Sequence, residues 1–170
     1  MSAELRISGV IRESIVDGPG MRFVVFCQGC PHRCEGCHNP QTHDFEGGNM
    51  CSTDRLLEEI KKDPILRGVT FSGGEPFCQP EELCELADGI LDMGMDIIVY
   101  SGYTFEELLK LGESNPYVIE LMKKCDILID GRFELEKRSL ALPFRGSTNQ
   151  RIIDLKESVR EGRAIEKELK

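Results

Sequence analysis

The chain has 170 residues, of which 40% are hydrophobic and 30% charged, a composition typical of an ordinary globular protein. This length predicts one domain over residues 1–170, and no linker or internal repeat divides it. The formal net charge of −9 argues against binding to nucleic acid, which requires cationic contacts to phosphates. No apolar run could span a membrane and no signal-peptide pattern is present, so we expect a cytoplasmic protein.

Short apolar, β-branched runs recur along the chain and indicate strands. They cover residues 22–26, 68–71, 96–100, 126–129 and, more weakly, 151–153. Near-continuous hydrophobicity is typical of strands that are covered on both faces, as in a parallel sheet. The sequence therefore predicts an α/β fold, but it does not separate an open sheet from a partial barrel.

Amphipathic patterns between these runs indicate helices. One covers residues 53–62, and a second begins near Pro80 and carries an apolar stripe as far as Leu91. A third begins after Thr104, because Thr104-Phe-Glu-Glu107 matches a capping box. The charged tail, residues 156–170, has few apolar side chains and predicts a solvated helix or a frayed end.

Three closely spaced cysteines follow the first predicted strand. Cys30, Cys34 and Cys37 have the spacing C-x3-C-x2-C, and no second closely spaced set exists. Three thiolates can hold a cubic iron–sulfur cluster by three irons, which leaves the fourth iron free to bind a second molecule. This spacing therefore predicts one cluster with an open corner.

Cys27 could supply a fourth thiolate and close this site. Residue parity places Cys27 on the same strand face as Phe23 and Val25, so we expect it to be the last strand residue rather than a ligand. The alternative is a zinc site or a fully ligated cluster. Three histidines near the cysteines could join such a zinc site: His32, His38 and His43.

Unusual loops follow four successive predicted strands. They are Cys27–Cys37, Ser72–Pro76 with the sequence Ser-Gly-Gly-Glu-Pro, Ser101–Thr104 and Asp130–Phe133. In parallel α/β folds, ligands bind at the carboxyl ends of the strands. We therefore expect the four loops to share one rim and to form one site.

Several motifs resemble a known family. The cysteine segment together with Gly73-Gly-Glu-Pro76 is similar to the signature of radical S-adenosylmethionine (SAM) enzymes. Asp17–Arg22 and Cys37-His-Asn-Pro40 narrow this resemblance to the glycyl-radical activating enzymes. Three further segments are similar to the activating proteins of anaerobic ribonucleoside-triphosphate reductase: Ser101–Thr104, Asp130–Phe133 and Phe144–Arg151. The resemblance covers roughly residues 5–154.

This resemblance implies a fold and a reaction. The fold would be a series of parallel βα repeats that form a partial, incomplete TIM-like barrel. Cys30, Cys34 and Cys37 would hold a 4Fe–4S cluster, and SAM would chelate its open iron. Reductive cleavage of SAM would give methionine and a 5′-deoxyadenosyl radical, which would take a hydrogen atom from a glycine of the reductase. A flavodoxin or ferredoxin would supply the electron.

The resemblance also implies which residues contact SAM. They are Gly36, Cys37, His38, Gly73, Gly74, Glu75 and Ser101. The glycine carbonyls would accept hydrogen bonds from the SAM ammonium group, and Glu75 would complement its charge. Four other polar residues are open to two interpretations, contact with SAM or the partner, or an ordinary structural role: Asp130, Arg145, Asn149 and Arg151.

Other functions stay open at this point. The protein could activate another glycyl-radical enzyme, such as pyruvate formate-lyase, or act on a small molecule by radical SAM chemistry. The short chain favours a protein substrate, because little sequence remains to build a closed pocket. A more distant alternative is a non-enzymatic electron-transfer protein with a metal centre held by four cysteines.

Overall fold

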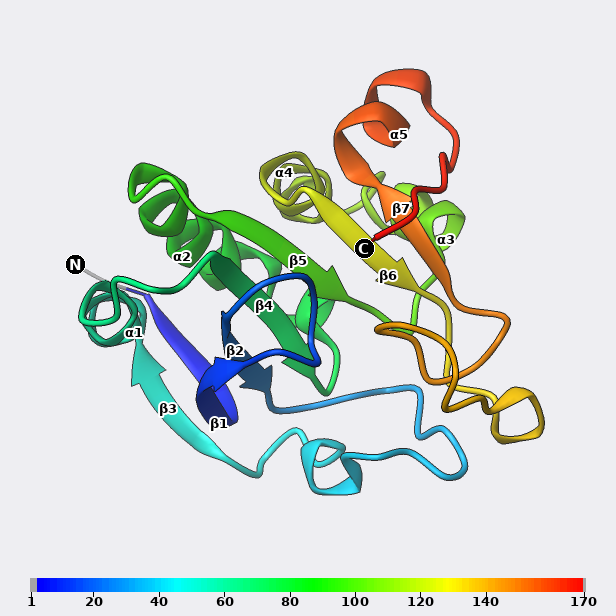
Figure 1. The fold of residues 1–170 in the computed structure, drawn as a ribbon, viewed down its shortest axis with the longest axis horizontal. Coiled ribbons are helices and arrows are strands. Elements are labelled where there is room, and N and C mark those ends of the chain that lie inside the picture. Colours follow the sequence, from blue (N-terminus) through cyan, green and yellow to red (C-terminus); the bar gives the residue numbers. More distant parts are fainter. Residues whose placement is uncertain (1–2, 170) are drawn as a thin grey trace.

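The computed structural model describes residues 3–169, and its centre is a seven-stranded mixed sheet (Figure 1). The strands are β1 (Glu4–Ser14), β2 (Arg22–Cys27), β3 (Asn49–Ser52), β4 (Gly68–Gly73), β5 (Asp96–Tyr100), β6 (Ile127–Asp130) and β7 (Arg151–Asp154). Their order in the sheet is β3-β1-β2-β4-β5-β6-β7. Strands β2, β4, β5 and β6 pair in parallel, whereas β1 and β3 at one edge and β7 at the other pair antiparallel.

Helices cover one face of this sheet. They are α1 (Thr53–Lys61), α2 (Pro80–Asp92), α3 (Phe105–Leu111), α4 (Pro116–Lys124) and α5 (Leu155–Glu161). Their apolar side chains and every second residue of the central strands form the main core, in which Phe23, Phe71 and Val99 are buried. Such an alternation is expected where one strand face packs on helices. Among the described residues, no helix is both long enough and apolar enough to cross a membrane.

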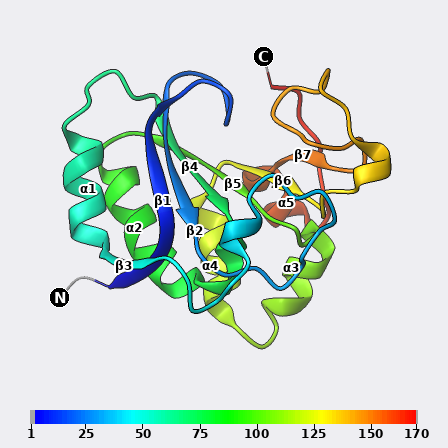
Figure 2. The same cartoon turned by 90° about the horizontal axis from the view of Figure 1, so that it is seen from below.

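The other face of the sheet is covered by loops. Ile98, Ile129 and Ile152 form a smaller apolar cluster there, and Phe144 and Leu169 pack against it. Figure 2 shows the blue loop before β2 and the gold segment before β7 on the side of the molecule away from α3 and α4. These loops cover the sheet face but not the carboxyl ends of the parallel strands, so a binding site can form at those ends.

Most of the predicted elements are confirmed. Strands β2, β4, β5 and β6 and helices α1 and α2 match the predicted ranges closely, and the Thr104 capping box starts α3 as expected. The predicted strand 151–153 is β7, but the parallel series stops at β6. The segment 131–150 that joins these two strands contains a short 3-10 turn and an isolated bridge between Arg138 and Ser147 but no α-helix, whereas a parallel connection usually crosses the sheet through a helix.

Other elements were not predicted from the sequence. Strand β1 alternates buried and exposed residues in its first half, β3 is short, and α4 begins at Pro116 after the cap residue Asn115. The expectation for the C-terminal tail was wrong beyond α5. The backbone N–H of Lys167 donates to the carbonyl of Ile152, so the tail lies against β7 instead of extending into solvent.

Cys27 lies where the parity argument placed it. It is the last residue of β2, its side chain is fully buried in the helix-side core, and burial raises the pKa of its thiol well above the usual range. Cys125 is buried in the same core, and burial raises the pKa of its thiol in the same way. Both cysteines therefore act as small apolar core residues.

Arg22 connects the loop before β2 to the sheet. Its side chain is fully buried, and its guanidinium donates to the Thr70 hydroxyl at 2.8 Å and to the carbonyl of Val69 at 2.9 Å. It also forms an ion pair with Asp96 at 2.6 Å and donates to the carbonyl of Pro19 at 3.2 Å. One buried cation therefore ties a loop and two strands together.

We expect the substitution Arg22→Met to lower the free energy of unfolding by about 3 kcal/mol, because it leaves Asp96 and several buried acceptors without a donor. Urea denaturation followed by circular dichroism measures this change. Arg12→Met is the control, since Arg12 is exposed and forms an ion pair with Glu59 at the surface. Equal stability losses in the two variants would contradict the role given to Arg22.

We also expect Cys27 and Cys125 to resist alkylation in the native protein without cluster. A raised pKa keeps both thiols protonated at pH 8, and only the thiolate reacts at an appreciable rate. Iodoacetamide labelling followed by peptide mass spectrometry should show both residues modified in urea but not in buffer. Native modification of Cys27 as fast as that of the partly exposed Cys37 would show that Cys27 is not buried.

Candidate functional site

The loops that follow the four parallel strands line one cavity of about 700 Å³. Residues from each loop contribute to its wall: Cys30, Cys34, Cys37, Gly73, Gly74, Ser101, Gly131 and Phe133. The prediction of a shared rim is therefore confirmed. Residues separated by a hundred positions in the sequence meet because neighbouring parallel strands end at the same edge of the sheet.

The cysteine loop directs backbone N–H groups toward its thiols. Burial raises the pKa of Cys30, and the N–H groups of His32 and Arg33 partly offset this effect. Burial also raises the pKa of Cys34. The backbone N–H of Phe133, in the loop after β6, has the opposite effect and lowers this pKa. Donors of this kind stabilise thiolates and the sulfur atoms of iron–sulfur clusters.

The donor set of this cavity fits a cluster better than a single metal ion. Cys30, Cys34 and Cys37 line the cavity, but within residues 3–169 no three His, Cys, Asp or Glu side chains are placed to hold one ion. A 4Fe–4S cluster instead takes one thiolate per iron, so three separate thiolates would hold it by three of its four irons. Cys27 faces the opposite side of the sheet and is not among the residues that line the cavity.

Gly73 and Gly74 allow the loop after β4 to approach the cysteine loop. A Cβ atom at Gly73 would lie 2.5 Å from the backbone nitrogen of Cys27, and one at Gly74 would lie 2.4 Å from the carbonyl oxygen of Gly29. The N–H of Gly74 donates to Cys27 at 2.9 Å, and the N–H of Glu75 donates to Gly29 at 2.8 Å. Both glycines are thus required by the protein itself, in addition to any contact with SAM.

Glu75 is fully buried beneath this cavity. Its carboxylate accepts hydrogen bonds from His32 Nε2 at 2.7 Å and from the Ser101 hydroxyl at 2.8 and 2.9 Å. It also accepts from the backbone N–H groups of Gly102 at 2.8 Å and Phe77 at 3.0 Å. Sequence reasoning considered His32 only as a possible zinc ligand, and nothing in the sequence showed that it contacts Glu75.

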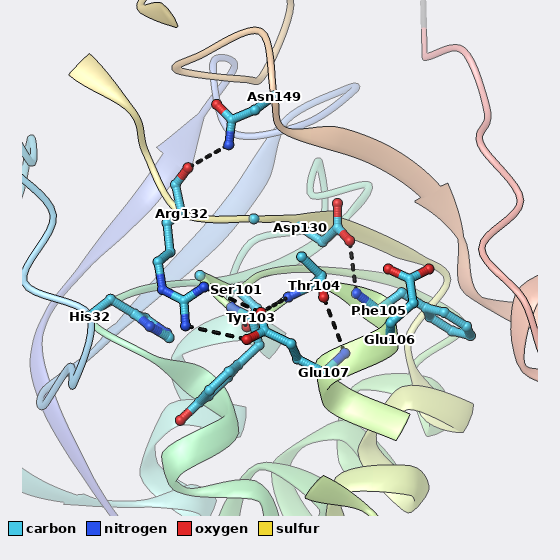
Figure 3. A network of polar contacts seen from close by, with 12 residues as sticks. His32, Ser101, Tyr103, Thr104, Phe105, Glu106, Glu107, Asp130, Arg132 and Asn149 are labelled. Carbon is cyan, nitrogen blue, oxygen red and sulfur yellow. Dashed lines mark hydrogen bonds and ion pairs between the residues drawn. The ribbon is translucent and has the colours of Figure 1, made fainter. Parts of the chain in front are cut away.

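The loop after β6 is held by a second buried carboxylate. Asp130 is only 1% exposed, accepts from the N–H of Phe105 at 2.8 Å and pairs with Arg151 at 2.6 Å. Arg151 also pairs with Glu106. Figure 3 shows Asp130 beside the start of α3. These contacts favour the structural interpretation of Asp130 and Arg151.

Two neighbouring contacts complete this network. Thr104 caps α3 by accepting from Glu107, whose carboxylate pairs with Arg132 at 3.3 Å (Figure 3). The side-chain amide of Asn149 donates to the carbonyl of Arg132 at 2.8 Å. Arg145, by contrast, lines the cavity, and its guanidinium donates to the carbonyl of Gln150 at 3.4 Å.

Of the remaining predicted SAM contacts, His38 is among the residues that line the cavity and Gly36 is not. His38 lines it with its ring centroid 5.1 Å from that of Phe133, and Gly36 lies against Phe133 and Leu135. The structure brings together all three cysteines with His38, Gly73, Gly74 and Ser101. Contact of these residues with SAM stays a prediction.

Apolar side chains at the cavity were missed from the sequence. Ile15 and Val16 of the loop before β2 are 70% and 71% exposed, and Leu140 is 91% exposed. All three line the cavity, and we call them the apolar rim. Single apolar residues in loops give no pattern from which a shared surface could be predicted.

Comparisons with known proteins relate the chain to an iron–sulfur family and to activating enzymes. A family described as "4Fe-4S single cluster domain" matches residues 16–153. The chain is 40% identical over 114 residues to the pyruvate formate-lyase-activating enzyme of Clostridium pasteurianum, covering 62% of this chain and 48% of that one. A solved structure of QueE from Escherichia coli aligns with a TM-score of 0.47 and 20% identity, over 59% of this chain and 53% of that one.

Two further relatives match most of the chain and most of their own length. The anaerobic ribonucleoside-triphosphate reductase-activating protein of Enterobacteria phage T4 is 35% identical over 144 residues, covering 81% of this chain and 86% of the relative. The protein of the same name from Escherichia coli K12 is 31% identical and covers 80% and 90%. With three cysteines on a shared rim and identity of this extent, the chain belongs to the 4Fe–4S family of anaerobic ribonucleoside-triphosphate reductase-activating proteins.

Proposed function

We propose that this protein is a radical SAM activase that generates the glycyl radical of anaerobic ribonucleoside-triphosphate reductase. When bound, the 4Fe–4S cluster supplies one electron that splits SAM into methionine and a 5′-deoxyadenosyl radical, which takes a hydrogen atom from a glycine of the partner. The products are 5′-deoxyadenosine and the glycyl radical. A flavodoxin or ferredoxin is the proposed electron donor.

The observation that carries this proposal is the separation of Cys27 from the other cysteines. Cys30, Cys34 and Cys37 line the cavity beside Gly73 and Gly74, whereas Cys27 is buried on the other side of the sheet. Three thiolates at a cavity leave one iron of a cluster without a protein ligand. This arrangement supports an open iron as the place where SAM binds.

The residues of the cavity have proposed roles in binding SAM. The carbonyls of Gly73 and Gly74 would accept hydrogen bonds from the ammonium group. Gly36, Cys37, His38 and Ser101 would contact the remainder of the molecule. Glu75 is proposed to contribute its negative charge near the ammonium group, although its oxygens already accept hydrogen bonds within the protein.

The fold proposal follows from the same site. We propose that residues 1–170 act as one radical SAM domain whose sheet corresponds to the incomplete barrel that the family resemblance implies. The sequential order β2-β4-β5-β6 and the helices on a single face support this proposal. In such a barrel, the site lies at the carboxyl ends of the strands.

The identity of the partner has one alternative. The pyruvate formate-lyase-activating enzyme of Clostridium pasteurianum is 40% identical to this chain, but the chain spans 48% of its length. The relatives named for anaerobic ribonucleoside-triphosphate reductase are matched over 86% and 90% of theirs. We therefore favour the reductase and keep pyruvate formate-lyase as the second candidate.

The three cysteines of the cavity can be separated from Cys27 by an assay for 5′-deoxyadenosine. The protein is reconstituted anaerobically with iron and sulfide, reduced, and given SAM. We expect Cys30→Ala, Cys34→Ala and Cys37→Ala to lose the product, because each removes a cluster ligand. Cys27→Ala should keep most of it, provided that circular dichroism shows a folded protein. Equal loss in folded Cys27→Ala would favour a centre with four thiolates.

The partner can be tested by electron paramagnetic resonance. Adding anaerobic ribonucleoside-triphosphate reductase to the reduced protein and SAM should give the signal of a glycyl radical. Pyruvate formate-lyase, added in the same way, serves as the comparison. A radical only on pyruvate formate-lyase would overturn the choice of partner and would leave the class of enzyme intact.

The apolar rim is the surface where we expect the glycine segment of the partner to dock. Leu140→Asp should lower glycyl-radical formation by about tenfold or more, because it places a charge in an apolar contact, while 5′-deoxyadenosine formation without the partner continues. Ile65→Asp is the matched control, since Ile65 is 60% exposed and does not line the cavity. Equal losses of radical formation in both variants would exclude the rim as the docking surface.

A further inference from the structure

We propose that the carboxylate of Glu75 is a positioning group that holds the cysteine loop against the loops after β4 and β5, in the protein without cluster as well as with it. We call the set of His32, Glu75, Ser101 and Gly102 the three-loop latch. The latch is a property of the chain itself, and its consequence for SAM cleavage rests on the proposed function.

The latch joins three loops at one point. His32 lies midway between Cys30 and Cys34 in the cysteine loop, Glu75 follows Gly73 and Gly74, and Ser101 and Gly102 follow β5. The side chain of His32 is 4% exposed, and that of Glu75 is fully buried. A hydrogen bond to a charged group in such a buried place contributes more than one at the surface.

Every partner of the Glu75 carboxylate is a donor. His32 Nε2, the Ser101 hydroxyl and the N–H groups of Gly102 and Phe77 share its two oxygens. A carboxylate offers only acceptors, so it satisfies all of these groups at once. An amide in its place would direct its NH₂ group toward donors.

Close packing fixes the position of the His32 ring. A Cβ atom at residue 102 would lie 2.3 Å from His32 Cδ2, so only glycine fits beside the ring. Tyr103 also meets the ring edge-to-face with the centroids 4.5 Å apart. Figure 3 shows His32 beside Ser101 and Tyr103. The ring is therefore held by shape as well as by its hydrogen bond.

This arrangement gives the latch a consequence for the cluster. Because His32 is two residues from both Cys30 and Cys34, fixing its side chain restricts the backbone between these two thiols. Glu75 is at the same time part of the loop whose glycines line the cavity. The latch therefore sets the distance between the cluster ligands and the proposed SAM-binding loop, which must be accurate for electron transfer to SAM.

Hydrogen–deuterium exchange on the protein without cluster tests the latch directly. We expect Glu75→Gln and His32→Ala to speed amide exchange about tenfold in both residues 30–37 and residues 101–103, and to leave α4 unchanged. Glu58→Gln is the control, because Glu58 is exposed on α1. His32→Gln should restore slow exchange, since its side-chain amide can donate to the carboxylate from nearly the same position as Nε2. Unchanged exchange in the cysteine loop of both Glu75→Gln and His32→Ala would overturn the proposal.

A double-mutant cycle on the reconstituted protein tests the consequence for SAM. We expect Glu75→Gln and His32→Ala each to keep the iron content and to raise the KM for SAM about tenfold, and the double variant to show no further increase. If Glu75 instead acts only by contacting SAM, His32→Ala will leave the KM unchanged, and the positioning role in catalysis will be wrong. Absence of SAM cleavage by the parent protein would contradict the proposed function, whereas the exchange experiment would still decide on the latch.

Discussion

The structure depends on the parallel pairing of β2, β4, β5 and β6, because this pairing brings the ends of four strands to one edge of the sheet. Backbone groups at such strand ends lack partners within the sheet, and buried ones must find them in the loops. The loops in this protein meet that need by bonding to one another. Gly74 and Glu75 donate to the backbone of the cysteine loop, and these bonds close the floor of the cavity.

Two buried carboxylates join loops that backbone hydrogen bonds alone do not hold together. Glu75 collects donors from three loops, and Asp130 joins the start of α3 to Arg151. Each carboxylate has a net of donors around it, which offsets the cost of burying its charge. The cysteines are in this way presented by a scaffold that is already bonded internally, and the apolar rim of Ile15, Val16 and Leu140 stays exposed above it.

The parts of the fold that were predicted from the sequence are those with strong local patterns. The central strands have continuous apolar runs, α2 has a full amphipathic stripe, and α3 has a capping box. Strands β1 and β3 were missed because their pairing at the edge requires only a partial apolar pattern. The antiparallel direction of β7 depends on the path of segment 131–150, which has no periodic signal.

The sequence by itself determined which residues can ligate a cluster and where they lie in the fold. Three cysteines follow one strand, a pair of glycines follows the next, and strand alternation directs the side chain of Cys27 into the core. These features are local, since spacing and strand alternation act over a few residues. Only the tertiary structure decided that Glu75 bonds to His32 and Ser101, that Asp130 bonds to Arg151, and that the three residues of the apolar rim line the same cavity. The hydrogen bonds and the ion pair among these contacts join residues 21 to 43 positions apart in the chain, and their partners are selected by the packing of the loops rather than by any pattern along the sequence.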